Sequence, residues 1–280
     1  MPTTPDLADL LAVALRAGRA AGRVLLDGRT TTFAVSTKSS ATDMVTAMDR
    51  AAEQTVVEIL NQERPEDAVV GEEGTKRSGT SGVRWFVDPL DGTTNYLYDL
   101  PMWSVSLAAE VAGYIIVGVV HDPSHGETFA ASKRGGAWLY RDADDSRPHR
   151  LGRDKHTERA PLTLATALVG TGFSYAAEER SRQAIVLSRI LPAVRDVRRM
   201  GSAALDLCAV AAGRLDAYYE RGTHAWDHAA GGLIAAEAGC WVGGLGDQPL
   251  STDMAAAAAP EIAAEFRQLL ADAEAAGRAI

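Results

Sequence analysis

The stretch VRWFVDPLDGTTN, residues 83–95, decides most of what can be inferred about this chain. Its first half is an apolar run that ends abruptly at Asp88, which is typical of a central strand buried on both faces. Pro89 holds the preceding residue in an extended conformation, and a tight bend then separates Asp88 from Asp91. We therefore expect two carboxylates to face the same point at the end of a buried strand.

The residues after Asp91 indicate a phosphate site. Gly92 allows close approach of the backbone, and Thr93 begins a predicted helix whose free N–H groups favour an anion such as phosphate. Carboxylates and a bound anion repel each other unless a cation lies between them, and hard divalent cations prefer oxygen ligands. Taken alone, however, Asp88 and Asp91 are equally well explained as an Asx turn.

Further acids occur on both sides of this stretch. Glu72 lies in the loop GEEG (71–74), directly after a predicted strand at 68–71, and Asp227 lies at the start of a predicted helix at 226–239. Taken singly, Glu72 is explained by a solvated loop and Asp227 by a helix cap. Only the joint pattern favours a shared acidic site.

Composition excludes several classes of protein. The 280 residues carry 28 Lys and Arg against 37 Asp and Glu, a formal charge of −9. A surface this acidic repels nucleic-acid phosphates, so we expect no nucleic-acid partner. Cys208 and Cys240 show no zinc-site spacing and are expected to be buried thiols in a reducing cytoplasm. The sequence shows no secretory signal and no apolar stretch of about 18 residues, so we expect a cytoplasmic protein without a membrane segment.

The remaining patterns predict a layered α/β architecture. Residues 103–140 show only strand signals separated by turn residues, as in an antiparallel meander. The second half alternates strands and helices. The predicted strands are 32–37, 68–71, 83–88, 166–170, 194–199 and 217–220. The predicted helices are one that begins at Pro5 with Thr4 as its cap, then 43–62, 178–191, 202–212, 226–239 and one from about 260. Residues 141–160 are predicted to form an exposed loop.

Together these motifs resemble the inositol monophosphatase family. GEE (71–73), DPLDGTTN (88–95) and WDHAAGGLIAAEAG (226–239) occur in the family's order, and KSSATDMVTAMD (38–49) and GSAALDLCAVAAGRLDAYYE (201–220) extend the resemblance. It implies an α/β (α+β) fold, the α/β/α/β/α sandwich of the inositol monophosphatase and fructose-1,6-bisphosphatase type. We expect a single domain over 1–280, with an N-terminal α+β part at about 1–145 and a C-terminal α/β part at about 160–280.

The resemblance also implies an activity, namely Mg²⁺-dependent hydrolysis of myo-inositol 1-phosphate and related inositol monophosphates to inositol and phosphate. About two or three Mg²⁺ ions per site are expected, and a small-molecule phosphate ester and a second copy of the chain are the expected partners. The implied metal ligands are Glu72, Asp88, the backbone carbonyl of Leu90, Asp91 and Asp227.

Catalytic and substrate-binding roles follow from the same resemblance. Glu72 is expected to help activate the attacking water, Thr93 paired with Asp49 to orient it, and Lys38 to lie near the site. Glu220 is expected to accept hydrogen bonds from ring hydroxyls. The full implied substrate-binding set is Asp91, Gly92, Thr93, Gly201, Ser202, Ala203, Glu220 and Asp227.

Several alternatives stay open. The substrate could instead be fructose 1,6-bisphosphate, histidinol phosphate or adenosine 3′,5′-bisphosphate, or the chain could be a regulatory binding protein that kept the fold. Glu220 could merely neutralise Arg221 or Arg214. Residues 171–174 match the family poorly and receive no role. His224 and His228 are not expected to be ligands, and Arg195, Arg198 and Arg199 are expected in salt bridges at a strand end or a subunit interface.

Overall fold

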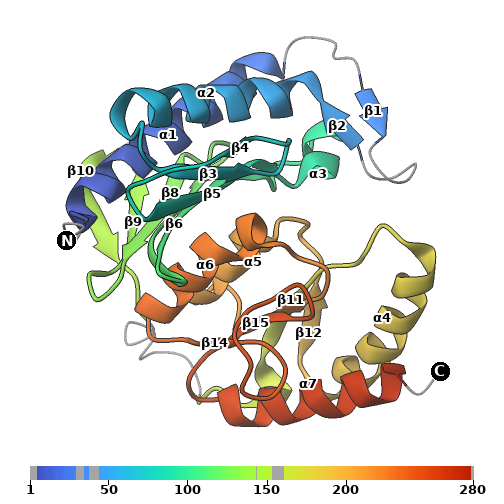
Figure 1. The fold of residues 1–280 in the computed structure, drawn as a ribbon. Coiled ribbons are helices and arrows are strands. Elements are labelled where there is room, and N and C mark those ends of the chain that lie inside the picture. Colours follow the sequence, from blue (N-terminus) through green and yellow to red (C-terminus); the bar gives the residue numbers. More distant parts are fainter. Residues whose placement is uncertain (1–4, 30–34, 38–43, 143, 153–160, 279–280) are drawn as a thin grey trace.

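Five layers alternate between helices and sheets (Figure 1). The computed structural model describes residues 5–29, 35–37, 44–142, 144–152 and 161–278. Lys38, the proposed cap Thr4 and the first half of the predicted strand 32–37 lie outside the described residues. The order of layers is two helices, a large sheet, two helices, a small sheet and two helices, so the predicted α/β/α/β/α sandwich is confirmed.

The first layer consists of α1 (Leu7–Gly28) and α2 (Ala47–Glu63). Asp6 caps α1, since its carboxylate accepts the amide hydrogen of Ala8 at 2.9 Å. The prediction that the helix begins at Pro5 is therefore wrong by two residues. Gly22 lets α1 lie close to the sheet, because a Cβ atom there would be 2.4 Å from the His121 ring.

The large sheet has the strand order β10-β9-β8-β7-β6-β5-β3-β4. The central strand β5 pairs with β6 in antiparallel and with β3 in parallel orientation, which confirms the predicted buried strand. β6 to β9 form the predicted meander. The strands are β3 (Ala68–Gly71), β4 (Lys76–Arg77), β5 (Val83–Asp91), β6 (Ser104–Val111), β7 (Tyr114–Asp122), β8 (Glu127–Ser132), β9 (Gly136–Arg141) and β10 (Asp144–Arg150).

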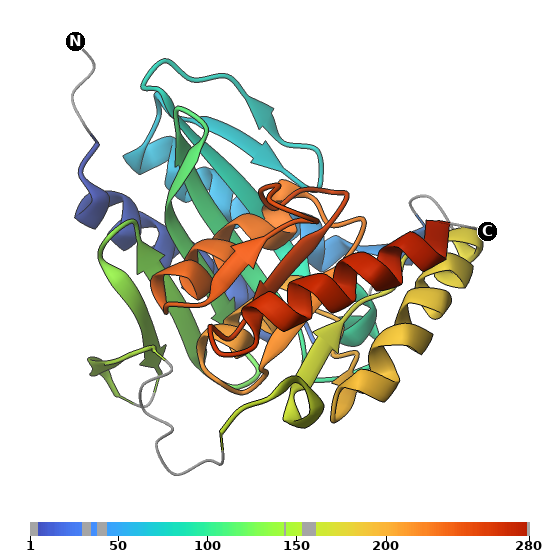
Figure 2. The same ribbon diagram turned by 90° about the horizontal axis from the view of Figure 1, so that it is seen from below.

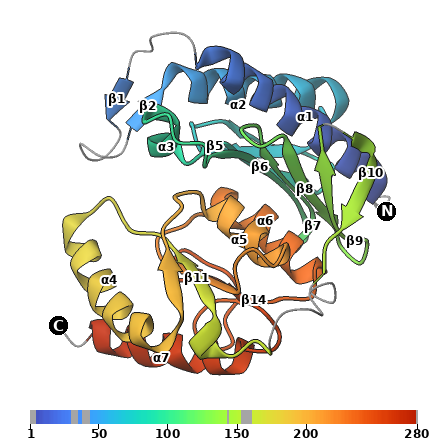
Figure 3. The same ribbon diagram turned by 180° about the vertical axis from the view of Figure 1, so that it is seen from behind.

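The middle layer, α5 (Ala203–Ala211) and α6 (Ala225–Glu237), packs between the two sheets (Figure 3). α6 approaches β7 closely because Gly118 lacks a side chain, and a Cβ atom there would be 2.8 Å from the Ala230 carbonyl oxygen. The core beneath this layer includes Phe129 of the large sheet together with Leu207 and Tyr218. The N-terminal and C-terminal parts of the chain therefore share one apolar cluster.

The small sheet and its outer helices complete the fold. The strand order is β12-β11-β13-β15-β14, with β11, β12 and β13 parallel and β15 antiparallel to both neighbours. Figure 2 looks onto the outer layer, where α7 and α4 lie side by side. The elements are β11 (Leu168–Thr171), α4 (Ala177–Ile190), β12 (Asp196–Arg198), β13 (Ala217–Glu220), β14 (Trp241–Gly243), β15 (Ala255–Ala258), α7 (Ala263–Arg278) and the 3₁₀ turns Leu164–Thr166 and Leu191–Ala193.

Two predictions of secondary structure need correction, and one strand was not predicted. The helix predicted from residue 43 begins at Ala47, because Met44–Thr46 (β2) pairs instead with Val35–Thr37 (β1). The loop predicted at 141–160 contains β10, a charged strand at the edge of the sheet, where exposed polar side chains are tolerated. The alanine run at 255–258, left without structure by the sequence, is the fully buried strand β15. Among the described residues no helix has both the length and the apolarity that a membrane crossing requires.

Candidate active site

Asp88 lies near the end of β5, where the strand is irregular. The register with β6 shifts between Asp88 and Asp91, at the point where Pro89 contributes no N–H to the ladder. The Asp88 carboxylate turns back to accept the Leu90 amide hydrogen at 2.9 Å, so the predicted Asx turn is present. Burial, together with the charges of Glu72, Asp91 and Asp227, raises the pKa of Asp88 well above its usual range. The turn and the acidic site are thus the same feature.

Glu72, Asp88 and Asp227 form an acidic cluster. Each contributes a carboxylate oxygen that lies within 4.8 Å of the other two. Glu72 follows β3, and its amide bonds to the Val87 carbonyl oxygen at 3.0 Å because β3 runs parallel to β5. Asp227 comes from the first turn of α6, more than 130 positions further along the chain. Tertiary structure therefore brings together three acids that are each unremarkable alone.

Asp227 has two roles at the start of α6. Its carboxylate accepts the His224 amide hydrogen at 2.6 Å, so it caps the helix while it also belongs to the cluster. Burial and the charge of Asp91 raise its pKa well above the usual range. His228 is buried beside Thr223, and His224 stacks on Trp226, so neither histidine is in the acidic cluster.

Glu53, a residue that sequence reasoning missed, holds the loop that carries Glu72. One carboxylate oxygen accepts the Glu73 amide hydrogen at 2.9 Å, and the other accepts the Thr75 hydroxyl at 2.6 Å. Gly71 makes room for this side chain, since a Cβ atom there would be 2.2 Å from it. The only signal in the sequence was an acid next to the apolar stripe of the predicted helix at 43–62.

Asp91 connects the two parts of the chain. Its Oδ2 atom accepts hydrogen bonds from the Ser202 hydroxyl at 2.6 Å and from the Ala204 amide at 2.8 Å. Burial raises its pKa to about 6, although these two bonds act in the opposite direction. Ser202 is also the N-cap of α5, because it accepts the Leu205 amide hydrogen at 3.2 Å. Asp91 is not one of the three clustered acids, so its role as a ligand stays a prediction.

Thr93 lies where the sequence predicted it, at the start of a helix near Asp49. Its hydroxyl oxygen is 3.4 Å from Asp49 Oδ2 and 3.1 Å from the Leu90 carbonyl oxygen. Asp49 is fully buried on α2. The helix α3 (Thr93–Leu97) has only five residues. Gly92 before it has a φ of 98° and would place a Cβ atom 2.8 Å from the Met102 carbonyl oxygen, so only glycine fits without strain.

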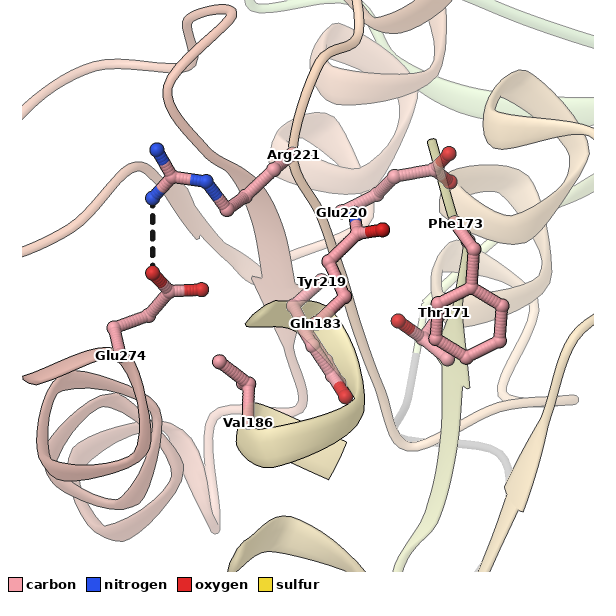
Figure 4. Close-up of a pocket in the computed structure, with 9 residues that line it drawn as sticks. Thr171, Phe173, Gln183, Val186, Tyr219, Glu220, Arg221 and Glu274 are labelled. Atoms are coloured by element: carbon pink, nitrogen blue, oxygen red, sulfur yellow. Dashed lines mark hydrogen bonds and ion pairs between the residues drawn. The ribbon is translucent and has the colours of Figure 1, made fainter. Parts of the chain in front are cut away.

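Glu220 ends β13 and is held in a way that the sequence did not show. Its Oε2 atom accepts the Tyr218 hydroxyl at 2.8 Å. The arginines once considered as its partners point elsewhere, since Arg221 pairs with Glu274 at 2.9 Å and Arg214 with Glu127 at 2.6 Å. Figure 4 shows the Arg221 side chain turned toward Glu274 while the Glu220 carboxylate lies on the other side. Glu220 therefore neutralises neither Arg221 nor Arg214.

Most of the predicted site residues open onto one cleft of about 500 Å³. Two predicted residues, Asp49 and Ser202, lie behind its wall rather than in it. The predicted residues that line it are Glu72, Asp88, Leu90, Asp91, Gly92, Thr93, Gly201, Ala203, Glu220 and Asp227. The cleft also includes Phe173–Ala176, part of the segment that received no role, and Arg199. Arg198 instead pairs with Asp196 at the end of β12.

Comparison with known proteins decides the family. A model described as the inositol monophosphatase family matches residues 6–275. The chain belongs to the inositol monophosphatase family. Mycobacterium tuberculosis inositol-1-monophosphatase SuhB is 45% identical over 214 residues, which cover 75% of this chain and 71% of that protein. Pasteurella multocida Nus factor SuhB is 38% identical over 263 residues, 92% of this chain and 94% of that protein.

Solved structures agree with this membership. Mycobacterium tuberculosis SuhB superimposes with a TM-score of 0.78 at 37% identity, and the match covers 96% of this chain and 98% of that one. The Bartonella henselae extragenic suppressor protein suhB gives 0.81 at 32% identity, over 93% and 98% of the two chains. The chain is thus a phosphatase of a metal-dependent family, and its acidic cluster has the oxygen donors that a hard divalent cation requires.

Proposed function

We propose that this protein is a Mg²⁺-dependent phosphomonoesterase acting on myo-inositol 1-phosphate and related inositol monophosphates. One observation carries the proposal. A single cleft holds both the acidic cluster of Glu72, Asp88 and Asp227 and a separate carboxylate, Glu220, whose neighbour Arg221 pairs with Glu274 instead. A cluster of acids suits a cation and phosphate, whereas a carboxylate outside the cluster suits the hydroxyl groups of a polyol.

The metal ligands are proposed to be Glu72, Asp88, Asp227, Asp91 and the Leu90 carbonyl, for about two or three Mg²⁺ ions. The donor set fits, because it is all oxygen and because burial and mutual repulsion raise the pKa of Asp88 and Asp227. A bound cation would relieve the repulsion between these carboxylates. When bound, the cations neutralise phosphoryl oxygens and acidify a water ligand.

The proposed catalytic residues act on the attacking water. Thr93 donates its hydroxyl proton toward Asp49 and thereby presents an oxygen lone pair to the water, which fixes the water's orientation. Glu72 accepts a proton from the same water as it attacks. Lys38 is proposed to add positive charge near the phosphate.

The rest of the cleft binds the substrate. Gly92 and Thr93, which line the cleft, offer backbone to the phosphate. The loop Gly201–Ala203 and the carboxylate of Glu220 contact the alcohol part of the ester. The hydrogen bond between Ser202 and Asp91 links the phosphate-binding part of the cleft to the alcohol-binding part.

There are two alternative functions. A related phosphatase would act on fructose 1,6-bisphosphate, histidinol phosphate or adenosine 3′,5′-bisphosphate. A regulatory binding role is favoured by the name of the Pasteurella multocida relative, Nus factor SuhB. The presence of every predicted acid argues for catalysis, because a protein that only binds partners has no use for a cluster of buried carboxylates that repel one another.

Assembly and location are proposed from the same membership. We expect a two-fold dimer with one active site per subunit, in the cytoplasm.

A single folding domain is expected because one apolar cluster joins Phe129 to Leu207 and Tyr218 across the two parts of the chain. One cooperative unfolding transition would support this, and two resolved transitions would contradict it.

Phosphate release from a panel of esters tests the proposed function. The panel is myo-inositol 1-phosphate, the three rival substrates and p-nitrophenyl phosphate, each with Mg²⁺ and with excess chelator. We expect the highest kcat/KM on inositol 1-phosphate and no release in chelator. Full activity in chelator would overturn the metal mechanism, and a higher kcat/KM on a rival ester would reassign the substrate.

A further inference from the structure

Tyr218 holds the carboxylate proposed to recognise the substrate alcohol. The two residues are two positions apart on β13, so their side chains leave the same face of the strand. The Tyr218 hydroxyl donates to Glu220 Oε2 at 2.8 Å, and the tyrosine itself is fully buried. A buried ring has little rotational freedom, so the position of its hydroxyl is set by the core. The hydrogen bond therefore limits where the Glu220 carboxylate can lie.

Gly172 supplies the space that this arrangement needs. It follows β11, the strand beside β13, and a Cβ atom built there would lie 2.0 Å from the Glu220 carboxyl carbon and 2.1 Å from both oxygens. No real Cβ atom occupies such a position, so even alanine at 172 would displace the carboxylate. The atoms displaced are the far end of a flexible side chain, so the backbone need not move.

Among the groups around Glu220, Tyr218 is the one that orients its carboxylate. The nearby Arg221 bonds to Glu274 at 2.9 Å and turns away from Glu220, as Figure 4 shows. Arg199 attracts Glu220 electrostatically, whereas Asp91 and the buried Asp206 repel it. None of these charges fixes the direction of the carboxylate as a hydrogen bond does. The bond uses one of the two carboxylate oxygens of Glu220, which itself lines the cleft.

We propose that Tyr218 and Gly172 are positioning residues that set the preference of this site for esters whose alcohol carries neighbouring hydroxyl groups. Tyr218 orients the Glu220 carboxylate, and Gly172 leaves it room in that orientation. The inference rests on the proposed function, and in particular on Glu220 accepting hydrogen bonds from the alcohol. Neither residue touches the phosphate or the attacking water.

The test compares myo-inositol 1-phosphate with p-nitrophenyl phosphate, which has no hydroxyl groups for Glu220 to accept from. Tyr218→Phe keeps the ring and removes only the donor. We expect it to raise KM for inositol 1-phosphate roughly threefold to tenfold, the range for one lost hydrogen bond. We expect kcat on that ester, and both constants on the aryl ester, to stay within about twofold of wild type. Gly172→Ala should give the same pattern by displacing the carboxylate.

Tyr219→Phe is the matched control. It removes a buried hydroxyl from the adjacent residue of the same strand, and the Tyr219 ring packs against Phe266 of α7 instead of bonding to Glu220. We expect no change on either ester. Thermal unfolding of each variant shows whether it folds, and if Tyr218→Phe does not, Gly172→Ala carries the test.

Double substitution separates positioning from structural support. If Tyr218 acts through Glu220, the variant Tyr218→Phe with Glu220→Gln loses no more on inositol 1-phosphate than Glu220→Gln alone. Three outcomes would overturn the inference and leave the proposed function standing. The losses in kcat/KM from the two substitutions could be additive, or Tyr218→Phe could lower kcat/KM equally on both esters. Tyr218→Phe could also have no effect while Glu220→Gln lowers kcat/KM on inositol 1-phosphate alone. Equal losses on the two esters for Glu220→Gln itself would overturn the role of Glu220, and the inference with it.

Discussion

Replacing Asp88 by Asn should stabilise the metal-free protein. The variant keeps the shape of the side chain and can still accept the Leu90 amide hydrogen, which the native residue accepts at 2.9 Å. It removes one member of a cluster whose three oxygen atoms lie within 4.8 Å of one another. The hydrogen bond is preserved and the repulsion is relieved, so the change isolates the charge.

The magnitude follows from Coulomb's law. Two unit charges at 4.8 Å, the upper limit of the separations in the cluster, repel by about 3.5 kcal/mol at an effective dielectric of about 20. The metal-free cluster reduces this cost by taking up protons, since burial and its neighbours raise the pKa of Asp88. We therefore expect a gain of about 1–2 kcal/mol near pH 8, or about 2 to 8 °C in Tm.

The pH dependence has a defined sign. A carboxyl group whose pKa is raised on folding contributes its full stability at low pH and loses it as the pH rises through the folded pKa. The advantage of Asp88→Asn should accordingly shrink toward pH 5 and grow toward pH 8. In wild type, a Mg²⁺ concentration of about 100 times Kd should restore about 2.7 kcal/mol, and the variant should respond much less.

Thermal unfolding in chelator and in saturating Mg²⁺, at both pH values, measures these effects. Asp253→Asn is the control, because it removes one negative charge from an exposed position outside the cleft. A variant at Asp88 that is less stable than wild type in chelator at pH 8 would refute the repulsion. An undiminished response to Mg²⁺ would refute the role of Asp88 in holding the metal.

Four further outcomes are expected. Thr93→Ala should lower kcat strongly and change KM less, because it removes the hydroxyl near Asp49; a change in KM alone would make Thr93 a binding residue. Ser202→Ala should cost about 1–2 kcal/mol in unfolding free energy, since it removes both the 2.6 Å bond to Asp91 and a helix cap, and an unchanged Tm would contradict this. Burial raises the pKa of Glu220 to about 7, so KM should rise more for inositol 1-phosphate than for the aryl ester as the pH falls below about 7; an equal change for the two esters would speak against it. Light scattering should report a dimer at micromolar concentration, and a monomer would refute the proposed assembly.

Much of the fold was predictable because its signals are local. The run at Val83–Asp88 is apolar apart from Arg84 and is typical of a strand, and turn residues between 103 and 140 separate the strands of the meander. Where the prediction failed, tertiary contacts overrode composition. Charged residues form the edge strand β10 because solvent covers one side of it, and alanines form β15 because helices pack closely on both faces of the small sheet.

The amino-acid sequence by itself determined which chemistry is possible, through the acids, the bend after Asp88 and the order of its motifs. What it could not determine was which groups meet. The bond from Ser202 to Asp91 spans 111 positions, and the space that Gly172 leaves for Glu220 lies between two strands 46 or more positions apart in the chain. Hydrogen bonds and steric fit depend on distances of a few tenths of an ångström, and such distances between remote segments are decided only when the two sheets pack against their shared helices.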